Sequence, residues 1–256
     1  MPKRTGTTEP ISREVAHDRR LCDLVNDSGR TRTIRMARAS FSSTDMNPLG
    51  QAIGRPLPDW VPPAFPPHRC LKGRFGRLEP LDSSRHAKDL HTAYALDEDG
   101  RNWTYLPYGP FTTFEQYHQW IEENCLGADP QFYAVIDEAS SKPVGVASYL
   151  RIAPDSGSIE VGHIHFSELM KRRPIATEAM YLMMKTAFDL GYRRYEWKCD
   201  ALNAGSCAAA QRLGLSFEGI FEQATVYKRR NRDTAWFAAL DSDWPKFTQP
   251  FLRNQL

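Results

Sequence analysis

Three consecutive basic residues, Lys171, Arg172 and Arg173, stand just before a segment with the apolar spacing of a helix, residues 177–190. The first amides of a helix have no partner inside the helix, and they lie at the positive end of its dipole. With basic side chains beside them, these amides form a site suited to phosphate. A solvated basic loop capped by Thr177 is the alternative, and this segment alone does not decide between the two.

Glu160 lies in SIEVGHIHF, residues 158–166, whose alternation predicts a strand leading into the basic turn. A carboxylate at a cleft can accept a proton directly or through water, which makes Glu160 the candidate general base. The alternative is a surface ion pair. His163 is an odd number of residues away and is expected on the opposite face of the strand. Glu196 and Asp200 are weaker candidates for the base.

A second polar segment, DALNAGSCAAAQRLGLSFEG, spans residues 200–219 and follows a predicted strand at 195–199. It begins with acidic and amide side chains and continues as a short predicted helix. Ser206 is either the N-cap of that helix or a hydroxyl that is free for another role, and the two interpretations have equal support.

The five cysteines are an odd number without CxxC or Cys/His ligand spacing, which argues against both a disulfide framework and a zinc site. Cys199 and Cys207 raise the idea of an acyl-cysteine, but no His and Asp at a recognisable spacing support it, so buried thiols are expected. His163 and His165 are expected as strand residues, and no metal is predicted.

The elements that must position these residues form an α+β pattern. Expected helices span 83–95, behind the cap Asp82, then 114–125, 177–190 and 206–213. Expected strands span 74–81, 132–136, 144–152, 158–166 and 195–199, followed by strands around 220 and from 226 to 240.

The chain divides into three parts by composition. Residues 1–47 are rich in Arg, Ser, Thr and Asp without Trp or Tyr, which predicts a disordered tail. A targeting peptide is the alternative, although its acidic residues argue against it. Residues 48–73 contain PLPDWVPPAFPP and are expected to form a proline-rich strap that Trp60 and Phe65 attach to the folded part, residues 74–256.

The 256 residues include 41% hydrophobic and 25% charged residues, an ordinary globular balance. The net charge of +2 comes from 33 basic and 31 acidic residues, so no global field favours nucleic acid or an acidic membrane. No apolar run approaches the ~18 residues of a membrane span. A soluble, cytoplasmic protein is expected.

The order strand, basic turn, helix, strand, Asn and short helix resembles the GNAT superfamily of acetyl-CoA N-acetyltransferases. KRRPIATEA places Lys171, Pro174 and Ala176 on the family pattern Gln/Arg-x-x-Gly-x-Gly/Ala, with proline where glycine is usual. Such a proline lacks an N–H but suits the first helical turn. Asn203 and Ser206 match the second family pattern, and the branch most resembled includes the ribosomal-protein alanine N-acetyltransferases.

This resemblance implies a mixed, mostly antiparallel sheet that is splayed between two adjacent strands and flanked by helices. It also implies acetyl-CoA as co-substrate, without metal. The residues that it assigns to the coenzyme are His165, Phe166, Lys171, Arg172, Arg173, Ile175, Ala176, Thr177, Asn203, Ser206 and Arg212. Where many members carry a proton-donating Tyr, this chain has Ala210, so Ser206 is the nearest hydroxyl for the departing thiolate.

An aromatic run, Trp103, Tyr105, Tyr108 and Phe111, lies between the first two predicted helices, where the family builds its acceptor pocket. Aromatic walls suit a substrate with an apolar part or a cation, and they suit a hydrophobic lid equally well.

The resulting expectation is transfer of an acetyl group to a primary amine of a small molecule or a protein N-terminus by direct attack, with Glu160 and Ser206 catalytic. Pro174 and Ala210 leave open a degenerate module that binds coenzyme A or a partner. A nucleic-acid binder would depend on the basic residues 228–232 and the tail, and the balanced charge disfavours it. A homodimer stays open, and no nucleic-acid or membrane partner is expected.

Overall fold

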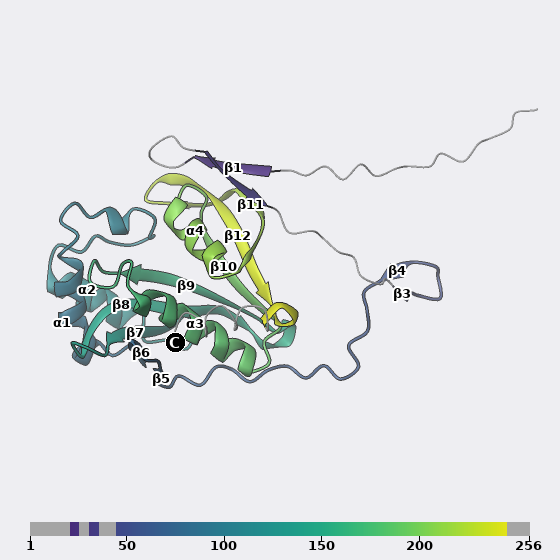
Figure 1. Cartoon of the computed structure of the whole chain (residues 1–256), viewed down its shortest axis with the longest axis horizontal. Coiled ribbons are helices and arrows are strands. Elements are labelled where there is room, and N and C mark those ends of the chain that lie inside the picture. Colours follow the sequence, from purple (N-terminus) through teal and green to yellow (C-terminus); the bar gives the residue numbers. More distant parts are fainter. Residues whose placement is uncertain (1–20, 26–30, 36–44, 245–256) are drawn as a thin grey trace, which may run out of the picture.

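The computed structural model describes residues 21–25, 31–35 and 45–244. Their main feature is an eight-stranded sheet in the order β11-β12-β10-β9-β8-β7-β6-β5, drawn in Figure 1. The strands are β5 (Leu71–Lys72), β6 (Gly76–Pro80), β7 (Gln131–Asp137), β8 (Lys142–Ala153), β9 (Ser158–Phe166), β10 (Arg194–Asp200), β11 (Ser216–Tyr227) and β12 (Arg230–Leu240). Only β9 and β10 pair in parallel, so the expected mixed, mostly antiparallel sheet is confirmed.

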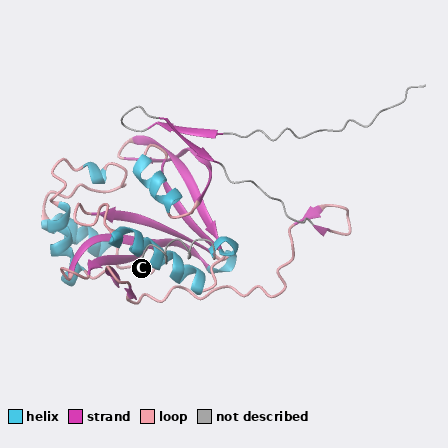
Figure 2. Cartoon of the chain, viewed as in Figure 1, coloured by secondary structure: helices cyan, strands magenta, loops and turns pink. Residues whose placement is uncertain are grey.

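Four α-helices cover the two faces of this sheet (Figure 2). They are α1 (Ser83–Tyr94), α2 (Phe114–Asn124), α3 (Pro174–Asp189) and α4 (Ala204–Arg212). Alternate residues of β7 divide between two apolar clusters, since Phe132 packs with α1 and α2 while Tyr133 packs with α3 and α4. Both faces of the central strands are therefore buried.

Polar caps begin three of these helices. The side chains of Asp82, Thr113 and Asn203 accept hydrogen bonds from the amides of Arg85, Gln116 and Ser206 respectively. Helix α3 begins at Pro174, three residues before the predicted start, because a proline tolerates the first helical position.

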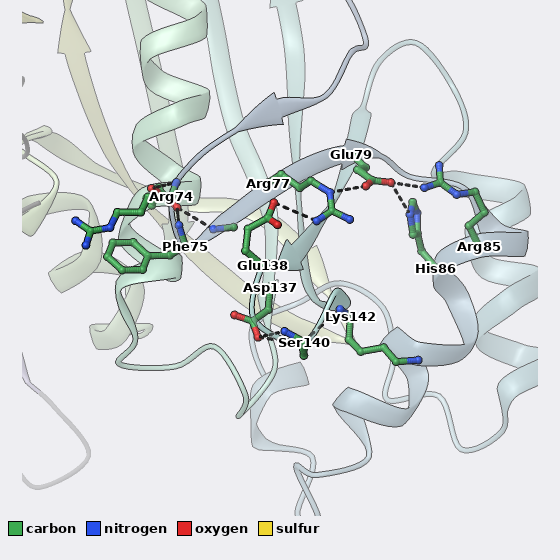
Figure 3. Close-up of polar contacts among 12 residues, drawn as sticks. Arg74, Phe75, Arg77, Glu79, Arg85, His86, Asp137, Glu138, Ser140 and Lys142 are labelled. Atoms are coloured by element: carbon green, nitrogen blue, oxygen red, sulfur yellow. Dashed lines mark hydrogen bonds and ion pairs between the residues drawn. The ribbon is translucent and has the colours of Figure 1, made fainter.

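Two carboxylates fasten the sheet to its helices. Figure 3 shows Glu79 of β6 facing Arg77, Arg85 and His86; Arg77 Nε lies 2.7 Å and His86 Nε2 lies 3.4 Å from it. The second is Glu178 of α3, which accepts the amides of Arg74, Phe75 and Gly76 at 2.7, 2.8 and 2.9 Å. Since each amide would otherwise lack an acceptor, Glu178 ties the turn before β6 to α3.

Strands β9 and β10 pair along only part of their length. Their register runs from Ser158/Arg194 to Val161/Trp197. Beyond that point β9 stays with β8, while β10 stays with β12 as far as Asp200/Thr234. The two central strands therefore diverge, as expected, and the opening between them begins after Val161 of β9 and Trp197 of β10.

The segment before β5 reaches the domain in extended form. Trp60 packs against Gly157, where a Cβ would lie 2.4 Å from the indole, and Gln131 Nε2 donates to the carbonyl of Pro66 at 3.0 Å. Phe65 is 44% exposed and does not attach the strap as predicted; Pro63 and Pro66 are buried instead. A proline ring at the domain surface buries apolar area with little entropy to lose, which favours these two over the larger aromatic.

Within residues 1–47 the structure describes three short strands, the last of which pairs with a strand just beyond this segment. Strand β1 (Leu21–Val25) pairs with β2 (Thr31–Arg35), and β3 (Asp45–Met46) pairs with β4 (Ala52–Ile53). The rest of this segment lies outside the described residues, so the disordered tail stays a prediction, as do the two boundaries between the three predicted parts of the chain. No helix in the described part is long and apolar enough to span a bilayer.

Candidate active site

A cleft of about 670 Å³ opens where β9 and β10 diverge. Val161 and Trp197 line it from the face covered by α3 and α4, whereas Glu160 and Lys198 line it from the opposite face. Because the strands no longer pair there, the cleft passes through the sheet. Groups that approach from the two faces can therefore meet inside it.

Glu160 is 3% exposed and holds two cations at the cleft wall. Arg151 Nη1 donates to Oε1 at 2.7 Å, and Lys198 Nζ lies 2.8 Å from Oε2 without the angles of a hydrogen bond. Lys198 also lies 2.8 Å from Glu196 and 3.8 Å from the ring centre of Trp236. One oxygen of Glu160 therefore has no hydrogen-bond donor among the described residues.

The expectation that His163 and Glu160 face opposite sides is wrong. The register between β8 and β9 passes from Ser148/Gly162 directly to Val146/His165, so β9 carries a bulge, and His163 has φ +49°. A bulge inserts a residue and reverses the alternation beyond it. His163 accordingly stacks on Tyr108 and Phe132, on the same face as Glu160.

Burial keeps both histidines of this strand neutral. It lowers the pKa of His163 to about 4, and nearby Arg151 lowers it in the same direction. It lowers the pKa of His165 to about 3, with a smaller effect from Lys171, and the ring stacks on Tyr94 at 3.8 Å. Neither ring is therefore in the charged imidazolium form at neutral pH.

His165 and Phe166 were predicted to bind the thioester carbonyl through an amide of this strand. In the structure the residues of β9 that line the cleft run from Glu160 to Ile164, and the carbonyl of His165 accepts from Tyr94 Oη at 3.0 Å. Ile164 lies within the bulge, between the paired positions Gly162 and His165. The part of β9 that lines the cleft thus ends at Ile164, immediately before the predicted pair.

Ser206 and Asn203 both line the cleft, from the start of α4. Asn203 Oδ1 accepts the amide of Ser206 at 3.0 Å, so Asn203 is the N-cap and the interpretation of Ser206 as the cap is wrong. Trp197 Nε1 donates to Ser206 Oγ at 2.9 Å. Because that oxygen accepts from the indole, the hydroxyl proton of Ser206 is directed elsewhere.

The basic turn has two neutralised cations and one that is free. Lys171 Nζ lies 2.6 Å from Glu168 and also bonds Asn102, and Arg173 lies 3.2 Å from Asp137. Arg172 is exposed with φ +59°, and no described residue pairs with it. No side chain caps α3, so its first amides and Arg172 remain suited to phosphate, which is the fit that a coenzyme A pyrophosphate requires.

The other residues assigned to the coenzyme lie outside the cleft lining. Ile175 and Arg173 line a separate hollow of about 140 Å³ beside Arg74, and Ala176 packs on the core. Thr177 is half-buried in the first turn of α3, and Arg212 is exposed in the last turn of α4.

The aromatic run divides between the cleft and the core. Tyr105 lines the cleft, and its hydroxyl donates to the carbonyl of Leu202 at 3.1 Å. Trp103, Tyr108 and Phe111 pack with α1 and α2 in the second apolar cluster. Of the four residues, only Tyr105 thus lines the cleft, and the role of the run as an acceptor pocket stays a prediction.

Cys199 and Cys207 are buried free thiols with sulfur atoms 3.6 Å apart. A hydrogen bond from Cys207 lowers the pKa of Cys199, and the same contact together with burial raises the pKa of Cys207. Only Cys199 lines the cleft. In the described part of the chain, no group of three or more His, Cys, Asp or Glu residues is placed to hold a metal ion.

The cleft wall contributed by the β11–β12 hairpin was not predicted from the sequence. Tyr227, Arg232 and Trp236 line the cleft from these strands, and Tyr227 Oη donates to Asp200 at 2.8 Å. The residues 228–232 that had suggested nucleic acid include the hairpin turn, where Lys228 and Arg229 have φ +47° and +60°. The alternation of residue types along β12 was the only signal in the sequence, and it did not show that side chains of this strand line the cleft.

The divided sheet and the cleft through it define the fold class of coenzyme A-dependent acyltransferases that the sequence resembles. Residues 77–216 match the acetyltransferase (GNAT) domain family. The chain belongs to the GNAT acetyltransferase family and is accordingly an acyltransferase. No curated protein sequence matches the chain.

Solved structures support the same assignment. A GCN5-related N-acetyltransferase from Brucella melitensis is 44% identical with a TM-score of 0.75, and the match covers 77% of this chain and 90% of that one. A probable acetyltransferase of the GNAT family from Chromobacterium violaceum is 39% identical with a TM-score of 0.71, covering 79% and 100%. RimL, a ribosomal L7/L12 α-N-protein acetyltransferase solved with coenzyme A, shares the fold at 21% identity and a TM-score of 0.58, covering 67% and 98%.

Proposed function

We propose that the protein transfers the acetyl group of acetyl-CoA to a primary amine of a small molecule or a protein N-terminus by direct attack. The observation that carries this proposal is the cleft through the sheet, which has Ser206 on one side and Glu160 on the other. A thioester that enters from the α3 and α4 face meets an amine that enters from the opposite face.

The coenzyme is assigned to the start of α3 and to the start of α4. Arg172 and the uncapped amides of α3 suit the pyrophosphate, while Asn203 and Ser206 lie along the path from there into the cleft. Pro174 removes an amide that the helix could not have used internally, so the departure from the family pattern does not close this site.

An amine attacks only when it is neutral, so a proton must leave it. Oε2 of Glu160 is the oxygen without a hydrogen-bond donor, and it takes that proton directly or through water. The amine nitrogen then forms a bond to the carbonyl carbon, and the carbon–sulfur bond breaks. The Ser206 hydroxyl is in position to donate a hydrogen bond to the departing thiolate, because its oxygen already accepts from Trp197.

Two measurements test this proposal. Calorimetry with acetyl-CoA should show binding, and a thiol-release assay should detect acetyl transfer within a panel of amino acids, short peptides, polyamines and aminoglycosides. Coenzyme binding without transfer to any amine would favour the degenerate module, whereas absence of both would contradict the proposal outright.

A further inference from the structure

Arg232 lies on β12, where alternate residues face the cleft. Arg232, Thr234 and Trp236 all line it, and the last two are paired with Asp200 and Lys198 of β10. The Nε of Arg232 is buried and has no hydrogen-bond partner in the described part of the chain. Arg232 is therefore a fixed cation at the cleft wall with an unsatisfied donor.

The other charged groups of the cleft already have partners. Arg151 and Lys198 both contact Glu160. Asp200, which lies closest to Arg232 along the strands, accepts from Tyr227 Oη and from the amide of Leu202, each at 2.8 Å. Arg232 forms no ion pair with any acid within residues 45–244. A half-buried guanidinium without a counter-charge is costly, and an anionic ligand group would offset that cost.

The neighbours of Arg232 also limit the positions that its side chain can occupy. Its guanidinium carbon lies 5.7 Å from the ring centre of Tyr227, which lines the same cleft. Arg232 precedes Thr234, where the pairing of β12 with β10 ends, by two residues, which is about 7 Å along the strand. The anion site and Glu160 therefore occupy different ends of one cleft.

We propose that the acceptor is an amine that also carries a carboxylate, which Arg232 binds while the amine lies beside Glu160. This inference rests on the proposed function. A free ω-amino acid and an acidic residue near the N-terminus of a peptide share this chemistry. Cations at the cleft wall favour such an acceptor doubly, because they attract the carboxylate and disfavour the ammonium form of the amine. Polyamines and aminoglycosides, which bring only positive charge, are disfavoured.

Matched pairs of acceptors test the proposal. We compare glycine, β-alanine, 4-aminobutyrate and 5-aminopentanoate with their amides as free amino acids, and Ala-Asp-amide with Ala-Asn-amide as peptides. The best carboxylate should exceed its amide at least tenfold in kcat/KM. Whether the free amino acids or the peptides react better identifies the source of the carboxylate. The number of carbons between amine and carboxylate in the best free amino acid measures the distance between Glu160 and Arg232.

In Arg232→Gln the ratio of kcat/KM for the carboxylate to kcat/KM for its amide should fall to about one. It should fall because kcat/KM for the carboxylate decreases, and not because kcat/KM for the amide increases. Arg232→Lys should keep part of the preference and guards against a variant that fails to fold. Arg230→Gln, on the same strand but exposed and outside the cleft lining, is the matched control. An unchanged preference in Arg232→Gln, or equal rates for each acid and its amide, overturns the inference while acetyl transfer itself stands.

Binding of glutarate, which has two carboxylates and no amine, separates this inference from the proposed function. Titration of the coenzyme A-bound protein with glutarate, followed by NMR, should show saturable binding that Arg232→Gln weakens at least tenfold. Arg232-dependent binding without acetyl transfer to any amine would remove the proposed function and keep the anion site. No Arg232-dependent binding would remove the anion site.

Discussion

Glu160 and Glu178 are both 3% exposed, yet the structure uses them differently. Three backbone amides saturate the carboxylate of Glu178, which fixes it within the core. Glu160 is held by two side chains at a cleft, one of them the 64% exposed Arg151, and keeps one oxygen without a hydrogen-bond donor. Burial alone therefore does not identify a catalytic acid or base; the kind of partner does.

A substitution at Glu160 is expected to have the largest effect, and that effect is on turnover. Glu160→Gln removes the base and should lower kcat about 10²- to 10⁴-fold with coenzyme binding retained. Thiol-release kinetics and calorimetry measure the two effects. Glu196→Gln is the matched control, because Glu196 contacts the same Lys198 but does not line the cleft. Equal losses in both variants would show that the ion pair matters and not the base.

Glu178 should show the opposite pattern, with a loss of stability. Glu178→Ala leaves three amides without their acceptor and should lower the free energy of unfolding by about 3 kcal/mol, measured by urea denaturation. Gly73→Ala should act in the same direction, because its Cβ would lie 2.4 Å from Glu178 Cδ. A Glu178→Ala protein that is fully stable but inactive would reverse the roles assigned here.

The next effect is a loss of stability at acidic pH. It comes from His163, which lies on the same strand as Glu160. Its folded pKa of about 4 lies below the ordinary value of 6.5, so the unfolded chain binds more protons between these pH values. Its contribution is therefore complete above pH 6.5 and is lost as the pH falls toward 4, by about 2 kcal/mol at pH 5. Melting temperatures at pH 7.5 and 5 should differ less in His163→Gln than in the unchanged protein.

A smaller effect concerns the coenzyme. Arg172→Ala should raise the Kd for acetyl-CoA about tenfold, because a charge-assisted phosphate contact is worth about 1.5 kcal/mol or more. Lys171→Ala and Arg173→Ala should add less, since Glu168 and Asp137 already hold those cations. Calorimetry measures each Kd, and unchanged affinity in the triple variant would place the pyrophosphate elsewhere.

The smallest effect is expected at Ser206. Ser206→Ala should lower kcat less than tenfold, because water or an amide can partly replace the hydroxyl beside the thiolate. Trapping a chemically competent acetyl-Cys199 or acetyl-Cys207 would contradict direct attack altogether, since that route needs no base at Glu160.

The sequence by itself determined the elements and their order. Periodicity predicted β9 at its observed bounds, and Asp82 marked the start of α1, because both signals depend only on neighbouring residues. The basic turn before α3 and Asn203 before α4 were also readable as local patterns. These local signals were enough to predict the family and to identify Glu160 as a candidate general base.

Only the tertiary structure decided which residues share the cleft. A bulge at His163 reversed the expected faces, and a hairpin far along the chain brought Arg232 and Tyr227 into the cleft that Glu160 also lines. The partners that distinguish Glu160 from Glu178 likewise come from other strands and turns. Alternation predicts faces only while pairing is regular, and contacts between distant segments follow from strand order and register, which no local pattern encodes.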